Sequence, residues 1–235
     1  MLCLGNLTAG GSGKTPAALA LIAAGIVLGF TRGVWLATGV AALFLLWRRR
    51  RLLVLALPVA AGLALWLGPE SLRDRALSFV APHGERDSNS HREICWKSGV
   101  RMVSAHPWVG AGPELVGSDL LNHLPHDVLP PLPEGYYAHL HNIYLQYPAE
   151  RGLPALAALL WLLGKVLWDF FRAIPVLSGF RRATVLGSIA AVLAILAGGM
   201  FEYNLGDSEV LTMFCSIIAL GYAAMHPHDG EPAHA

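Results

Sequence analysis

The sequence predicts an all-α integral membrane protein with about six transmembrane helices and a large, partly helical periplasmic loop. Hydrophobic residues make up 54% of the 235 residues and charged residues only 14%, whereas about 25% of a soluble domain is charged. The apolar residues gather into long runs, which basic clusters and one long polar segment separate. A formal net charge of +1 argues against a nucleic-acid-binding protein, and the three cysteines show neither metal-site nor disulfide spacing.

The apolar runs place the helices. A helix needs about 20 apolar residues to cross a bilayer. The run 16–47 is too long for one crossing, and the Thr31-Arg32-Gly33 sequence interrupts it, so we expect two spans there. The six predicted spans are, in order, about 16–30, 31–47, 52–67, 143–168, 183–201 and 208–225.

Basic residues in short loops predict the orientation. The Arg48–Arg51 cluster and the loop 169–182 are basic and should be cytoplasmic. The loop 201–209 has three acids and no Lys or Arg, so it should lie on the outer side. Strict alternation then places both termini in the cytoplasm. The predicted parts are a cytoplasmic P-loop-like segment 1–15, three spans over 16–67, a periplasmic loop 68–142, three spans over 143–225 and a disordered cytoplasmic tail 226–235.

The long polar segment is the predicted working face of the protein. Residues 68–142 hold seven of the ten histidines, and a loop of this length without a function would be unusual. Ser90 with Glu93 three residues later has the pattern of a capping box. We therefore expect a helix that starts after Ser90 and ends before Pro107.

Two motifs resemble the O-antigen ligase family, which includes protein O-oligosaccharyltransferases and related polymerases. The first combines Arg92 and Trp96 with "HPWVGAGPE" at 106–114, and the second is "HLHNIYLQYPAERGLPAL" at 139–156. "TRGVWLA" and "FEYNLGDSEV" are weaker supporting matches. The resemblance covers roughly residues 17–225. The family typically has about twice as many spans, so the chain resembles its C-terminal half, and a fragment whose N-terminal half is a missing partner stays open.

The resemblance implies a metal-independent glycosyltransferase of the bacterial inner membrane, without a cofactor. A glycan on undecaprenyl diphosphate would move to a hydroxyl of lipid A-core on the periplasmic side. The resemblance implies His141, with His139 beside it, as the catalytic residues, because histidine is a base near neutral pH. It implies Arg32 and Arg92 as ligands of the diphosphate, which suits the planar arginine fork. Helix-capping, snorkelling and surface roles for these residues stay open.

A glycine-rich run at 5–16, "GNLTAGGSGKTP", is similar to the P-loop of lipid A 4'-kinase (tetraacyldisaccharide 4'-kinase). Gly13, Lys14 and Thr15 are therefore candidate nucleotide-binding residues, with Thr8 in place of the usual glycine. Only "MLCL" precedes the run, and one strand cannot form a sheet. A kinase-like protein or remnant remains an alternative, as do an oligosaccharyltransferase, a polymerase and an inactive membrane subunit.

Overall fold

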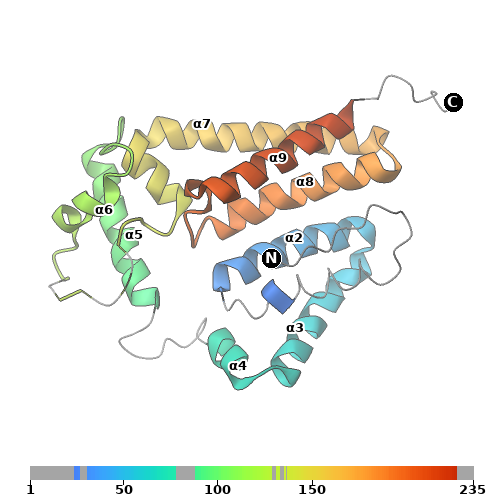
Figure 1. The fold of residues 1–235 in the computed structure, drawn as a ribbon, viewed down its shortest axis with the longest axis horizontal. Coiled ribbons are helices and arrows are strands. Elements are labelled where there is room, and N and C mark those ends of the chain that lie inside the picture. Colours follow the sequence, from blue (N-terminus) through green and yellow to red (C-terminus); the bar gives the residue numbers. More distant parts are fainter. Residues whose placement is uncertain are drawn as a thin grey trace.

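All regular structure in the described residues is helical. The computed structural model describes residues 24–26, 31–77, 88–128, 131–132, 135 and 137–226. Within these ranges the chain forms α-helices and short 3-10 helices and no strand (Figure 1). The prediction of an all-α protein is therefore confirmed.

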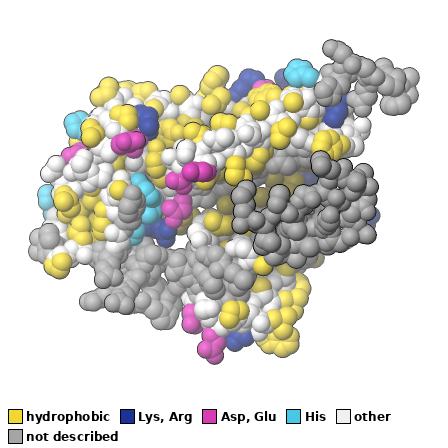
Figure 2. All heavy atoms as spheres, viewed as in Figure 1, with side chains coloured by type: hydrophobic (Ala, Val, Ile, Leu, Met, Phe, Trp, Pro, Cys, Tyr) yellow, Lys and Arg dark blue, Asp and Glu magenta, His cyan; other side chains and the backbone are white. Residues whose placement is uncertain are grey.

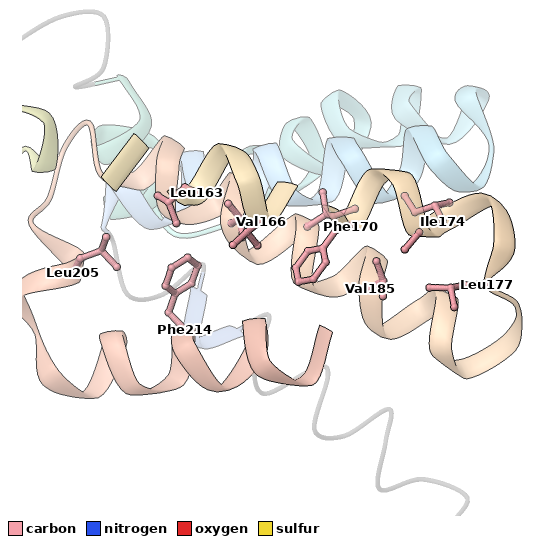
Figure 3. Packing of buried hydrophobic residues seen from close by; sticks show 11 residues of the cluster. Leu163, Val166, Phe170, Ile174, Leu177, Val185, Leu205 and Phe214 are labelled. Atoms are coloured by element: carbon pink, nitrogen blue, oxygen red, sulfur yellow. The ribbon is translucent and has the colours of Figure 1, made fainter. Parts of the chain in front are cut away.

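A bundle of three long helices forms one side of the molecule. The helices are α7 (Ile143–Ala173), α8 (Gly179–Gly198) and α9 (Ser208–Met225), which pack side by side (Figure 1). All three are long and apolar enough to cross a membrane, which confirms three predicted spans. Their buried core includes Phe170 and Phe214 (Figure 3).

The helices between 32 and 77 overlap the predicted spans 31–47 and 52–67, but they are not among the described helices that are long and apolar enough to cross a membrane. α2 (Arg32–Arg49) packs along α8 and has arginines at both ends. The 3-10 helix Arg51–Leu55, α3 (Ala56–Leu67) and α4 (Glu70–Leu77) follow, and α3 has only 12 residues. Most of the predicted span 16–30 lies outside the described residues. Spans over 16–67 and the periplasmic position of 68–142 thus stay predictions.

From Ser88 onward, the polar segment packs against one end of the bundle (Figure 1). It contains α5 (Ser88–Ala105), α6 (Val116–Asp119) and the 3-10 helix Leu120–His123. The predicted cap at Ser90 is wrong, because α5 already begins at Ser88, but the helix does end before Pro107. A small separate core joins these elements to α7: Cys95, Met102, Val116, Leu120, Leu140 and Ala149.

A bend in α7 receives the turn that follows α5. At Gly152 the backbone is not helical, with φ 79° and ψ 166°. Leu153 N–H donates to the Pro107 carbonyl at 2.7 Å, and Gly112 N–H donates to the Glu150 carbonyl at 3.0 Å. A Cβ on Gly110 or Gly152 would collide with backbone of the opposite segment. The two motifs, at 106–114 and 139–156, are therefore held together by backbone contacts that require glycine. We call this contact the clasp.

Candidate functional site

Glu202 is the centre of a polar cluster that joins three segments of the chain. It lies in the loop between α8 and α9, at 199–207. Its Oε1 accepts a hydrogen bond from Arg92 Nη2 of α5 at 2.6 Å. Its Oε2 lies 3.2 Å from His141 Nδ1, just before α7. Figure 2 shows histidine, acidic and basic side chains gathered on the face where the polar segment meets the bundle.

The start of α7 is tied to the loop that carries Glu202. Asn142 is the N-cap, and its Oδ1 accepts hydrogen bonds from the backbone N–H groups of Tyr144 and Leu145. Asn142 Nδ2 donates to the Met200 carbonyl at 3.0 Å, and Ile143 N–H donates to the Gly199 carbonyl at 2.8 Å. These bonds hold the residue before the cap, His141, directly beside the loop.

His141 itself has an uncommon backbone conformation. Its φ is 49°, and among the described non-glycine residues only Glu114 shares a positive φ. Such conformations cost free energy and cluster at functional sites. The His141 backbone N–H donates to His139 Nδ1 at 3.1 Å. A local hydrogen bond thus helps to hold the turn that brings the two histidines together.

Three imidazole rings form one cluster. The ring centroids of His139 and His141 are 4.0 Å apart, and the His91 ring meets His141 edge to face at 4.8 Å. His91 and His141 are buried. Burial, and then the neighbouring His141, lower the pKa of His139 to about 4. His139 is therefore neutral near neutral pH.

The charge of Glu202 is stabilised by its neighbours. Burial raises the pKa of its carboxyl, but the hydrogen bond with His141 and the positive charge of Arg92 lower it by more. The pKa of Glu202 consequently lies below its ordinary value, and the side chain is a carboxylate at neutral pH. A fixed carboxylate against an imidazole Nδ1 orients the ring.

A second polar chain holds the segment before α7 in place. Leu140 N–H donates to Gln146 Oε1 at 2.8 Å, and Gln146 Nε2 donates to Glu150 Oε1 at 2.7 Å. Glu150, only 3% exposed, also forms an ion pair with Arg151. The buried carboxylate is therefore paired, as buried charges need to be.

A pocket of about 700 Å³ opens beside the cluster. This volume lies within the range of small-molecule sites, about 300–1,000 Å³. Residues from α2, α7, α8 and the connecting loops line it, and its polar lining consists of Glu114, His139, Gln146, Glu150, Glu202, Tyr203, Asn204 and Asp207. Carboxylates and amides of this kind can hydrogen-bond the hydroxyl groups of a sugar.

The structure brings together most of the residues predicted for the chemistry. Arg92, His139 and His141 meet at Glu202. Arg32 is the first residue of α2, and its side chain lies outside the described part of the structure. Its neighbour Gly33 lies beside Glu202, because a Cβ on Gly33 would be 3.8 Å from Glu202 Cγ. Gly13, Lys14 and Thr15 also lie outside the described residues.

Sequence reasoning missed Glu202 as the centre of the site. Its signal was the weaker motif "FEYNLGDSEV", which supplies an acid between two spans. The ligand atoms of His139, His141 and Glu202 lie within 4.8 Å of one another, so these side chains could together hold a metal ion. Both oxygens of Glu202 are, however, engaged by Arg92 and His141. The prediction of no metal stays a prediction.

Comparison with known protein families identifies a matching family model. A family model described as O-antigen ligase matches residues 17–160, which is more than half of the chain. The matched range contains Arg32, Arg92, His139 and His141, and Glu202 follows it in the chain. A search of curated proteins gave no match.

Proposed function

From the premise that the chain belongs to the O-antigen ligase family, we propose that it moves a glycan from undecaprenyl diphosphate to a hydroxyl of lipid A-core. Family membership and the three apolar helices indicate a membrane protein with a glycosyltransferase-like function. The proposal adds the donor, the acceptor and a site on the periplasmic face of the bacterial inner membrane. The observation that carries it is the Glu202 carboxylate, which contacts both His141 and Arg92.

His141 is the proposed base. With Nδ1 facing Glu202 Oε2 at 3.2 Å, a proton on Nδ1 places the basic lone pair on Nε2. Nε2 accepts the proton of the acceptor hydroxyl while the acceptor oxygen bonds to the anomeric carbon of the donor glycan. Glu202 then stabilises the imidazolium that forms. A positioned base of this type contributes about 10²–10⁴-fold to a rate.

Two arginines are proposed to bind the departing diphosphate and to stabilise its negative charge. The bond between the anomeric carbon and the phosphate oxygen breaks, and its electrons leave on that oxygen. Arg92 supplies a permanent positive charge at the site and a guanidinium with five N–H donors, of which an Nη2 hydrogen goes to Glu202. Arg32, at the start of α2 beside the cluster, is proposed as the second cation for the diphosphate. No step of this scheme uses a metal ion.

The test is transfer by variants in a bacterium that lacks its own O-antigen ligase. We expect the intact chain to attach glycan to lipid A-core, and His141→Ala to abolish the attachment while membrane insertion is unchanged. His106→Ala is the matched control, because His106 is an exposed histidine of the same segment outside the cluster. Normal transfer by His141→Ala would refute the assignment of the base.

The same assay separates the alternatives. Glycan attached to protein indicates an oligosaccharyltransferase, and longer lipid-linked glycan without attachment indicates a polymerase. An inserted chain that yields no product in any of these readouts indicates an inactive subunit. In the first two cases the proposed acceptor is wrong, and in the third the proposed activity is wrong.

A further inference from the structure

We propose that the turn formed by Trp108 and Val109 inserts into the headgroup boundary of the lipid bilayer, level with the bend of α7. This inference is independent of the proposed reaction. It concerns a part of the polar segment that the sequence places outside the spans. The proposed partner is the lipid surface, and the observations below come from exposure, backbone contacts and helix lengths.

Trp108 and Val109 are large apolar residues on the outside of the molecule. Trp108 is 73% exposed and Val109 is 76% exposed. Their turn is rigid, because the flanking residues are held to α7 by the Leu153–Pro107 and Ala111–Ala149 backbone hydrogen bonds, each 2.7 Å. A rigid, exposed tryptophan suits the membrane interface, where its ring is buried and its N–H stays hydrated.

The bend of α7 lies where the membrane-crossing part of the helix begins. The part after the bend, 153–173, is roughly 31 Å long at about 1.5 Å per residue, close to a hydrocarbon core of about 30 Å. Its second half contains Lys165 and Asp169, which neutralise each other in an i,i+4 ion pair. The 20 residues of α8 and the 18 of α9 give roughly 30 and 27 Å by the same measure. All three helices thus match one bilayer thickness when α7 enters at Gly152.

Charge along α7 changes at the same place. Glu150 and Arg151 form an ion pair just before the bend, and the sequence 153–164 after it has no charged residue. Near the other end, the guanidinium of Arg172 lies 5.9 Å from the ring of Trp168, which is 61% exposed. Trp108 and Trp168 therefore stand near opposite ends of the part of α7 after the bend, as tryptophans of two interfaces do.

A lipid surface explains these features better than a protein partner. The turn is hydrogen-bonded to a helix that has the composition of a membrane span, so lipid surrounds the same part of the molecule. In this position the turn fixes the height of the polar segment above the bilayer. The Glu202 cluster, which lies on the side of α7 before the bend, would then stand at the headgroup level.

The test uses an environment-sensitive fluorophore on the full-length protein in lipid nanodiscs. Val109→Cys is labelled with a nitrobenzoxadiazole dye, and Val100→Cys in α5 is the control, because Val100 is a 54% exposed valine of the same segment. Cys3 and Cys215 are replaced by alanine. Cys95 can stay, since it is fully buried and burial raises the pKa of its thiol to about 12.

Two types of nanodisc report how deep the labelled side chain lies in the bilayer. Spin-labelled lipids carry the quencher either near the headgroup or deep in the acyl chain. We expect a blue-shifted emission at position 109, with a larger loss of intensity from the shallow quencher, and neither effect at position 100. Trp108→Cys provides a second labelled position if the first variant does not fold. The proposal would be overturned if the emission wavelength at positions 108 and 109 equalled that at position 100. It would also be overturned if the deep lipid quenched these two positions more strongly than the shallow lipid.

Discussion

Arg92 and Glu202 lie 110 residues apart in the sequence and form a 2.6 Å ion pair. The second oxygen of the same carboxylate faces His141 Nδ1. Glu202 therefore couples the orientation of a candidate base to that of a candidate phosphate ligand, although it lies only in a weaker supporting match, "FEYNLGDSEV", and in neither of the two main motifs.

The first prediction concerns the charge of Glu202. Glu202→Gln keeps the shape of the side chain but removes the carboxylate that orients and stabilises His141. We expect kcat for glycan transfer to fall by about 10²-fold, the lower end of the effect of a positioned base, with a smaller change in KM. Glu209→Gln, an exposed acid of the first turn of α9, is the control and should keep normal kcat.

The ion pair itself can be measured by a double-mutant cycle. Arg92→Ala leaves the Glu202 carboxylate without its cation, and Glu202→Gln leaves Arg92 without its anion. We expect both single variants to lower the melting temperature in detergent, and the double variant to lose less than their sum. A coupling free energy of about 0.5–3 kcal/mol is typical of residues in contact. Strict additivity would show that the pair contributes nothing.

The same position can be tested by glycan transfer. Compared with Arg92→Ala, Arg92→Lys should restore transfer only in part, since lysine lacks the guanidinium fork.

Gly152 tests the clasp between the two motifs. Gly152→Ala forces a Cβ against the Trp108 backbone at a φ of 79°, and a strained backbone of this type costs about 1–3 kcal/mol. We expect a lower melting temperature and reduced transfer. Gly164→Ala is the matched control in the same helix, because its Cβ would meet nothing within 4 Å. It should be neutral or slightly stabilising, as alanine favours a helix. An unchanged melting temperature for Gly152→Ala would contradict the role of the clasp.

The lowered pKa of His139 predicts a pH dependence of stability. The pKa falls from 6.5 to about 4 on folding, so the folded state binds fewer protons than the unfolded state in that interval. The contribution of His139 to stability is therefore fully present above pH 6.5 and is lost as the pH falls toward 4. Glu202, whose pKa is also lowered on folding, adds a loss only below its ordinary value of 4.5.

The matching variant is His139→Asn, whose Oδ1 can replace Nδ1 as acceptor for the His141 N–H. Melting temperatures measured in detergent between pH 6.5 and 5 should fall less steeply for this variant than for the wild type. His106→Asn, at an exposed position, should follow the wild type. Parallel curves for all three proteins would rule out His139 as the group responsible.

The kinase alternative has its own test at the P-loop-like segment. We expect Lys14→Ala to leave glycan transfer unchanged, because the proposed chemistry uses no nucleotide. We also expect the full chain not to bind ATP, measured with a fluorescent ATP analogue in detergent. Saturable binding that disappears in Lys14→Ala would support the kinase interpretation instead.

Sequence reasoning was most successful where composition alone decides the structure. The start of α7 at Ile143 coincides with the predicted start of the fourth span, and α9 coincides with the predicted span 208–225. The start of α8 was predicted four residues late, because Arg181 and Arg182 were assigned to a basic loop. In the structure Arg181 is helical and donates to the Ala224 and Met225 carbonyls at the end of α9. Arginine at such a position is a helix-capping residue, which no local pattern distinguishes from a loop residue.

The site was predictable only in part for a similar reason. Arg92 and His141 belong to recognisable motifs, but their meeting at Glu202 depends on tertiary packing. An acid next to a span usually caps a helix or forms a surface pair, so the weak motif "FEYNLGDSEV" alone did not distinguish Glu202 from the other acids of that loop. The failed cap at Ser90 is a smaller case, in which the helix simply starts earlier, at Ser88. The bend at Gly152 likewise requires the Trp108 backbone, from a segment that precedes it by more than 40 residues.

The position of Glu202 in the chain also governs the order in which the site is built during synthesis. A ribosome that has released α5 and the first turns of α7 has already supplied Arg92, His139 and His141, but their shared carboxylate does not yet exist. It arrives with the loop that follows α8, at 199–207. The cluster is therefore completed only after α8 and the loop behind it have been synthesised, so a product that terminates before Glu202 carries the histidines and the arginine without this carboxylate.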